Sequence, residues 1–173
     1  IYRVIEKSRR ADYAERLEIS TDVFERFPDL RIGIAVVRGV QVLDTHPELE
    51  ALKFEMADDV HNRYQGVNLG SLERIKAFRE IYRAFGVDPG ERSSSVEALL
   101  RRAARGKGLP AVNTVVDALN VTSLEMVIPR AGYDLGQLSL PVTLRFAQAG
   151  EPFVPMGSGD ASIWAERETD ISC

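Results

Sequence analysis

The stretch Val112-Asn113-Thr114-Val115-Val116-Asp117-Ala118-Leu119-Asn120-Val121 sets three spaced polar residues within an apolar segment. The pattern predicts a helix over residues 113–124, in which Asn113, Asp117 and Asn120 share one face, although the valines leave a strand open. A polar stripe inside an apolar element is costly unless each group is paired. These side chains therefore either bond to loop backbones and hold the fold, or line a pocket for a polar ligand.

A basic cluster precedes this stretch. Arg101, Arg102 and Arg105 fall on a predicted helix, Arg92 lies before it, and Lys107 follows between two glycines. One interpretation is a solvated helix end, where cations complement the helix dipole. The other is a patch that contacts phosphates and lets an acidic protein bind RNA.

The helices are predicted from apolar periodicity and from their end signals. A helical turn spans residues 22–27. A longer helix opens at His46-Pro47 and buries Leu49, Leu52, Phe54 and Met56. A third runs from a Ser71 cap to Phe85 and ends at Gly86. A fourth spans residues 96–105, with Ser94 and Glu97 as a capping box and Gly106 and Gly108 as its stop.

The strands are predicted from valine-rich or alternating runs. They span residues 17–20, 31–43 as two strands or one bent strand, 140–147 and 152–156, the last two as a hairpin that turns at Ala149-Gly150. Residues 129–138 form a loop. Strands and helices segregate in part, which favours an α+β domain of layered sheet and helices.

Composition narrows the class of protein. The chain has 173 residues, 45% apolar and 28% charged, which fits one globular domain over residues 1–173, or two small lobes that share one core, and excludes disorder of the whole. No apolar run is long enough to cross a membrane. The net charge of −4 argues against non-specific nucleic-acid binding by the whole chain. The start at Ile1 and the end at Cys173 lead us to expect truncation at both ends.

The residues that could hold a metal are few. Cys173 is a lone cysteine, so disulfides and cysteine-based zinc sites are excluded. His46 and His61 match no metal-ligand spacing. We therefore expect no metal and no cofactor, and a single thiol without a signal peptide favours the cytoplasm.

Several motifs in order resemble a known family. They are Tyr82 to Pro89, Ser95 to Arg102, Leu109-Pro110, Asn113, Val116-Asp117, Asn120, Tyr133-Asp134, Leu144-Arg145 and Gly150-Glu151. In this order they resemble the editing domain of the phenylalanyl-tRNA synthetase beta subunit, formed by that chain's third and fourth domains, and its stand-alone relatives. The synthetase has a histidine two positions before the aromatic residue, where this chain has Ala131.

The resemblance implies an α+β editing domain that deacylates mischarged aminoacyl-tRNA in trans through a positioned water. The chemistry of ester hydrolysis makes Asp117 our candidate catalytic residue, since its carboxylate could bind the substrate ammonium or orient the water. Substrate contacts would come from Asn113, Asn120, Tyr133, Asp134 and Glu151. Phosphate contacts with tRNA would come from Arg92, Arg101, Arg102, Arg105 and Lys107. An aminoacyl-tRNA synthetase is a second conceivable partner, whereas a membrane is not expected.

Two alternatives stay open at this stage. A non-catalytic module would bind tRNA or a synthetase but leave the ester intact. An amino-acid-binding protein would bind its ligand independently of the arginine cluster.

Overall fold

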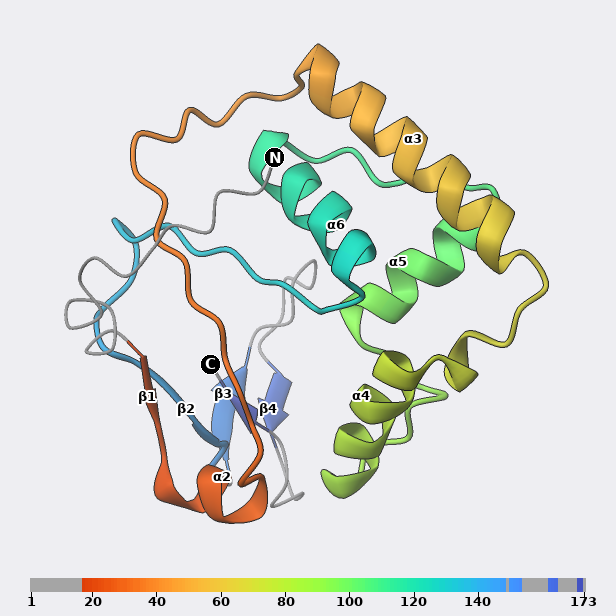
Figure 1. Ribbon diagram of the computed structural model, residues 1–173. Helices are drawn as coiled ribbons and strands as arrows, with labels where there is room; N and C mark the ends of the chain where they lie inside the picture. Colours follow the sequence, from red (N-terminus) through yellow and green to blue (C-terminus); the bar gives the residue numbers. More distant parts are fainter. Residues whose placement is uncertain (1–16, 149, 154–161, 165–170, 173) are drawn as a thin grey trace. The chain divides into compact units, whose positions relative to one another are not determined.

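A computed structural model describes residues 17–148, 150–153, 162–164 and 171–172 (Figure 1). The chain divides into two compact units. We call Ile1–Arg38 with Asp134–Cys173 the sheet unit, and Gly39–Tyr133 the helical unit. The mixed α and β composition predicted from sequence is confirmed, with helices beside a small sheet that includes a parallel pair.

The sheet unit is built around strand β2, Val142–Phe146. It pairs in parallel with β1, Leu17–Ile19, and antiparallel with β5, Ile171–Ser172. The short helix α2, Thr21–Arg26, packs on β2, and Val23 and Leu144 are buried in this unit. The predicted first strand and the helical turn after it are confirmed.

A second ladder in the sheet unit corrects one expectation. Strand β3, Glu151–Phe153, pairs antiparallel with β4, Ser162–Trp164. The predicted strands near 140–147 and 152–156 both contain a strand, but they do not pair as a hairpin. The predicted turn residue Ala149 and residues 154–156 lie outside the described residues.

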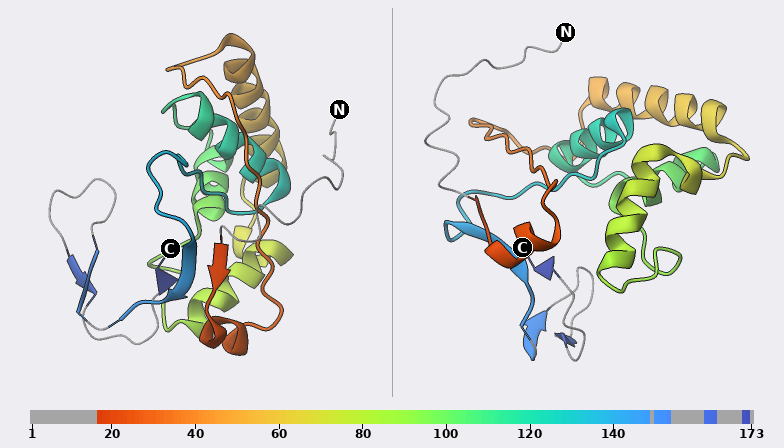
Figure 2. Two further views of the ribbon diagram at one scale, coloured as in Figure 1. Left: turned by 90° about the vertical axis from the view of Figure 1, so that its left-hand side faces the viewer. Right: turned by 60° about the horizontal axis from the view of Figure 1, so that its bottom comes forward.

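The helical unit contains four α-helices and one short 3₁₀ helix. They are α3 (Pro47–Tyr64), η1 (Leu69–Ser71), α4 (Glu73–Ala84), α5 (Ser95–Ala104) and α6 (Thr114–Met126). Helices α3, α5 and α6 pack against one another, and α4 extends beyond η1 (Figures 1 and 2). Their shared core includes Val60, Ile75, Val96, Leu100 and Leu124.

Glycines end two of these helices as predicted. Gly86 after α4 and Gly106 after α5 both have positive φ, at 76° and 71°. Each begins a Schellman turn, in which Val87 N–H reaches the Tyr82 carbonyl and Lys107 N–H reaches the Arg102 carbonyl. A left-handed residue here favours glycine because a Cβ would meet the following carbonyl.

The largest correction concerns residues 31–43. They form no strand, and Ile32, Ile34, Val37, Val40 and Val42 are exposed. Their β-branched composition favours a pleated surface, but a strand requires a partner, and none of the described strands pairs with them.

Three smaller expectations about helices are also wrong. In α3, Leu52 and Phe54 are exposed, the latter 76%, whereas Lys53 and Val60 are the buried residues. Leu49 and Met56 are partly buried. The hydroxyl of Ser71 donates to the Asn68 carbonyl rather than capping α4, whose N-cap residue is Leu72.

None of the helices in the described part of the chain has the length and apolar composition needed to cross a bilayer. Across the same residues, no three His, Cys, Asp or Glu side chains are grouped closely enough to hold a metal ion.

Candidate functional site

Glu97, in the first turn of α5, is the buried centre of an ionic triad with the partly exposed Arg79 and Arg101. Its side chain is 1% exposed. Its Oε2 accepts from Arg79 Nε at 3.0 Å, and its Oε1 accepts from Arg79 Nη2 at 2.6 Å and from Arg101 Nη2 at 2.7 Å. One carboxylate therefore joins α4 to α5 and fixes two guanidinium groups.

This triad replaces the predicted capping box. Ser94 is the N-cap residue of α5, but its side chain makes no cap hydrogen bond and its Oγ is buried without a partner among the described residues. Hydrogen bonds from two guanidinium groups stabilise a carboxylate more than one bond from a backbone N–H does. Glu97 therefore binds the two arginines. The predicted start of α5 is confirmed, but the predicted capping role of Glu97 is wrong.

The charges of the triad support one another. The hydrogen bond from Arg79 lowers the pKa of Glu97 most, burial opposes it, and Arg101 lowers it further. The same hydrogen bond raises the pKa of Arg79. Burial, followed by the Glu97 charge, raises the pKa of the nearby Tyr82. Glu97 is thus a stable anion at neutral pH.

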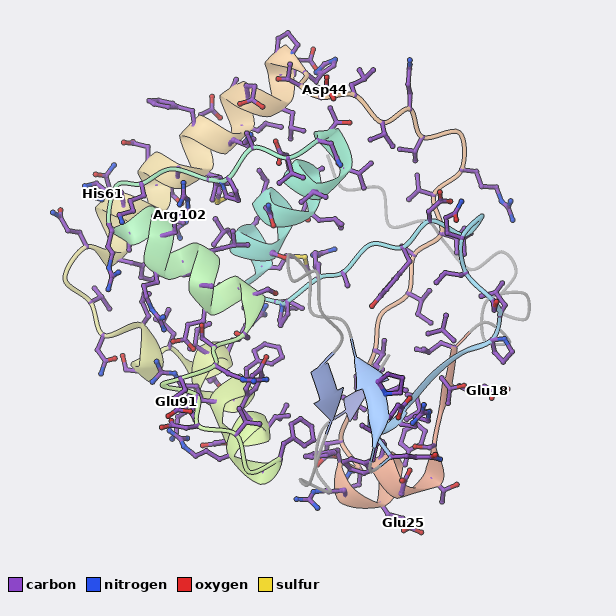
Figure 3. The ribbon with its side chains drawn as sticks, turned by 180° about the vertical axis from the view of Figure 1, so that it is seen from behind. Glu18, Glu25, Asp44, His61, Glu91 and Arg102 are labelled. Carbon is purple, nitrogen blue, oxygen red and sulfur yellow. The ribbon has the colours of Figure 1, made fainter. Side chains whose placement is uncertain are left out.

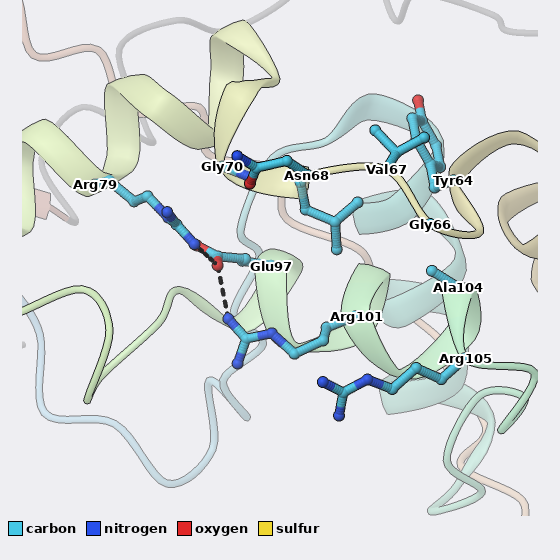
Figure 4. A pocket seen from close by; sticks show the side chains of 11 residues that line it. Tyr64, Gly66, Val67, Asn68, Gly70, Arg79, Glu97, Arg101, Ala104 and Arg105 are labelled. Carbon is cyan, nitrogen blue, oxygen red and sulfur yellow. Dashed lines mark hydrogen bonds and ion pairs between the residues drawn. The ribbon is translucent and has the colours of Figure 1, made fainter.

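An open hollow of about 370 Å³ lies over the triad (Figure 4). Its cationic side is formed by Arg79, Arg101 and Arg105. The rest of its wall comes from the end of α3, the following loop and α5, through Tyr64, Gly66, Val67, Asn68, Leu69, Gly70, Glu97 and Ala104. Three cations face one carboxylate here, so the hollow carries excess positive charge.

Gly70 is required for the close approach of Arg79. A Cβ at this position would collide with the guanidinium of Arg79. Gly70 N–H also donates to Asn68 Oδ1 at 3.1 Å, which holds the loop at one edge of the hollow. The missing side chain therefore makes the room that the arginine occupies.

The predicted basic residues have different environments. Arg101 and Arg105 line the hollow, one helical turn apart, and Arg105 forms no ion pair with a described residue. Arg102 Nε donates to the Gly108 carbonyl at 3.1 Å, near the end of α5 where His61 Nδ1 lies 2.9 Å from the Ala104 carbonyl oxygen (Figure 3). Arg92 and Lys107 are exposed in loops on either side of α5.

Asp117 is buried within the helical unit. Its Oδ2 accepts from Lys53 Nζ at 2.6 Å, and its Oδ1 accepts from Val112 N–H at 3.0 Å. Burial lowers the pKa of Lys53, but bonds and charges from Asp117 and Glu50 outweigh it and raise the pKa overall. Both Asp117 oxygens are occupied and 1% exposed, so these contacts favour the fold-holding interpretation of this residue.

The two predicted asparagines differ. Asn113 is the N-cap residue of α6, and its Oδ1 accepts from the Val115 and Val116 N–H groups at 3.1 and 3.0 Å. Asn120 is half-buried on α6, and its amide makes no hydrogen bond within the described part of the chain. The predicted helix is confirmed, and of its three polar residues Asn120 is left with the most hydrogen-bonding capacity.

The remaining predicted substrate residues lie outside α6. Tyr133 is exposed at the end of the helical unit. Asp134 accepts from Gly136 N–H at 2.9 Å, an Asx turn. Glu151 is held by both terminal nitrogens of Arg145 and by Gln148 N–H, and these hydrogen bonds, Arg145 first, lower its pKa to about 2.

Sequence reasoning missed Arg79, Tyr64, Asn68 and Gly70 at the hollow, and Lys53 beside Asp117. Glu97 and Arg101 stand four residues apart on one helix, a spacing that signals an ion pair. No comparable local signal exists for Lys53 and Asp117, which are 64 residues apart.

Comparison with models of protein families gives one match, to the model described as B3/4 domain, over residues 77–172. This range covers more than half of the chain and includes α5, α6 and β2. Comparisons with curated proteins and with solved structures give no significant match.

Proposed function

The chain belongs to the B3/4 domain family of the phenylalanyl-tRNA synthetase beta subunit, and we propose from this that it deacylates mischarged aminoacyl-tRNA in trans. In the synthetase beta chain this domain is associated with tRNA binding and editing. We propose a single functional domain over residues 1–173, because the family match covers parts of both units.

The observation that carries the proposal is the cationic hollow beside α5. Arg101 and Arg105 share one helix face, and Glu97 holds Arg101 in place. Guanidinium groups bind phosphates through paired N–H donors, so such a face suits an RNA backbone. Arg92, Arg102 and Lys107 would extend the contact along the RNA.

The proposed reaction needs no protein nucleophile. An aminoacyl ester is already activated, so a site must hold the ester, orient a water and stabilise the oxyanion. Asn120 is our candidate to bind the carbonyl oxygen or the ribose, since its amide is uncommitted to the described residues. Tyr133, Asp134 and Glu151 remain proposed substrate contacts.

Asn113 and Asp117 enter this proposal differently. Their side chains already cap α6 and pair with Lys53. We propose that they act by fixing α6 and thereby placing Asn120. Asp117 would bind the substrate ammonium or orient the water only if Lys53 released it.

Asp117 is buried and paired with Lys53, which favours one second candidate, a non-catalytic module that binds tRNA or a synthetase. Such a module would protect or leave unchanged the ester half-life, whereas a deacylase shortens it. An amino-acid-binding protein would be insensitive to loss of Arg105.

The test is a deacylation screen of the protein against a panel of mischarged tRNAs. We expect at least one ester to be cleaved faster than in buffer, with Asn120→Ala slowing the cleavage and the exposed Asn62→Ala as the control amide. If no ester on the panel is cleaved, the proposal that the protein is an enzyme is rejected. If the protein binds tRNA without cleaving the ester, the non-catalytic module is favoured.

A further inference from the structure

We propose that the hollow beside α5 is a subsite for one unpaired nucleotide of RNA, with its phosphate on Arg101 and Arg105 and its base against Tyr64. All the residues involved lie in the helical unit. This inference deepens the proposed function and rests on it for the choice of RNA as the source of the nucleotide.

The phosphate half follows from the donors that the triad leaves unused. A guanidinium carries five N–H groups. Glu97 engages only the Nη2 of Arg101, which leaves its Nε and Nη1 for a ligand. Arg105 has all five donors available to the hollow, because its side chain forms no ion pair or hydrogen bond with a described residue.

The arrangement is also set before a ligand arrives. Glu97 and Arg101 lie on α5 and Arg105 is its C-cap residue, and their four-residue spacing places them on one side of the helix. The carboxylate holds Arg79 and Arg101 in fixed positions, and Figure 4 shows Arg105 beside Arg101. Fixing these side chains in advance reduces the entropy lost on binding.

The base half follows from the opposite wall. Tyr64 and Val67 supply an aromatic ring and an apolar side chain there (Figure 4), and the Arg63 guanidinium lies over the Tyr64 ring at 5.7 Å from its centroid. Bases stack on aromatic side chains with little sequence preference. Asn68 uses its Oδ1 to accept from Gly70 N–H, and no described residue accepts from its amide N–H groups, which suits them to a base edge or a ribose hydroxyl.

Size separates a nucleotide from a bare anion. The hollow, at about 370 Å³, is at the lower end of the range for pockets that take small organic ligands. A lone phosphate would fill the arginine side only and would make no contact with Tyr64 or Val67. A duplex keeps its bases stacked on each other, so only an unpaired nucleotide can use both halves.

The experiment is an NMR titration of the intact chain with adenosine 5′-monophosphate, adenosine and inorganic phosphate. We expect saturable shifts at the hollow with the monophosphate, and at least about tenfold weaker binding for each of the two fragments. Arg105→Ala should weaken the monophosphate about tenfold, whereas the exposed Arg83→Ala on α4 should not change it.

A second pair of variants tests the base. Tyr64→Leu should weaken the monophosphate roughly tenfold and Tyr64→Phe should preserve it, because stacking needs the ring and not the hydroxyl. If Tyr64→Leu does not fold, retained affinity in Tyr64→Phe together with the fragment comparison still decides the matter.

Competition identifies the source of the nucleotide. A short single-stranded RNA should displace the monophosphate, and an RNA duplex of the same length should not. Equal binding of phosphate and the monophosphate, equal competition by duplex, or no saturable shift up to about 10 mM would each overturn the proposal. If the protein deacylates tRNA but does not bind the nucleotide, only the proposed subsite is rejected. If it binds the nucleotide but deacylates no tRNA, only the proposed enzyme activity is rejected.

Discussion

At the scale of single residues, the Lys53–Asp117 pair is the most consequential contact in the helical unit. It joins α3 to α6 through a bond of 2.6 Å between two buried side chains. Asp117→Ala leaves Lys53 buried with only Glu50 as its partner, so it should lower the free energy of unfolding by about 3 kcal/mol. Urea unfolding followed by circular dichroism measures this.

The double variant Lys53→Met/Asp117→Leu separates structure from catalysis at this position. It removes both charges, so it should unfold at a higher urea concentration than Asp117→Ala. Lys76→Met, in an exposed pair with Glu80, is the control and should change stability by less than about 1 kcal/mol. A folded double variant that retains deacylation would exclude Asp117 as a catalytic residue.

Glu97 gives stability a dependence on pH. Its hydrogen bond with Arg79 lowers its pKa below the ordinary 4.5. The stabilisation is therefore fully present above pH 4.5 and is lost as the pH falls through the lower folded-state pKa. In urea titrations from about pH 6 to about pH 3, the stability advantage of the native chain over Glu97→Gln should shrink steadily. An advantage that is constant across this range would contradict the assigned pairing.

The local sequence predicts where helices begin better than it predicts which side chains pair. Ser94 and Glu97 marked the beginning of α5, and Asn113 marked the beginning of α6. The long-range partners of Glu97 and Asp117, Arg79 and Lys53, come from α4 and α3, at distances of 18 and 64 residues along the chain. Such pairings depend on how helices pack, and a local motif contains no information about that.

At the scale of elements, the C-terminus of α5 positions the basic cluster. Gly106 has φ of 71°, and a Cβ there would also contact the His61 ring at 3.6 Å. Gly106→Ala should therefore destabilise the protein by about 1–2 kcal/mol, measured by thermal or urea unfolding. Gly33→Ala is the control, since φ is not positive and no atom lies within 4 Å of its added Cβ. Equal effects of the two substitutions would contradict the helix end described.

Helices were predicted more accurately than strands, for a physical reason. The signals for a helix lie within its own sequence, as glycine or proline at its ends and an apolar period of 3.6 residues. Four of the predicted helices agree with α3, α4, α5 and α6 within a few residues. A strand depends on its neighbour. The valine-rich residues 31–43 find no partner among the described strands, and β2 pairs with β1 across most of the chain rather than with β3.

At the scale of the whole molecule, the net charge of −4 conceals a local excess of positive charge. The triad neutralises one of the three arginines at the hollow and leaves two in excess. RNA binding should therefore weaken as salt rises. Arg105→Ala should weaken tRNA binding and reduce the salt slope by about 1, in fluorescence anisotropy at several salt concentrations, whereas Arg83→Ala should change neither. Identical slopes for both variants would place the RNA elsewhere.

The most direct measurement of the central claim is the half-life of mischarged aminoacyl-tRNA esters with and without this protein, across a panel of amino acids and tRNAs. We predict that at least one ester decays faster with the protein at substoichiometric amounts, and that Arg105→Ala slows this decay by raising KM more than it lowers kcat, because Arg105 is assigned to tRNA binding. Half-lives equal to those in buffer for every ester, in a folded protein that binds tRNA, would contradict the account.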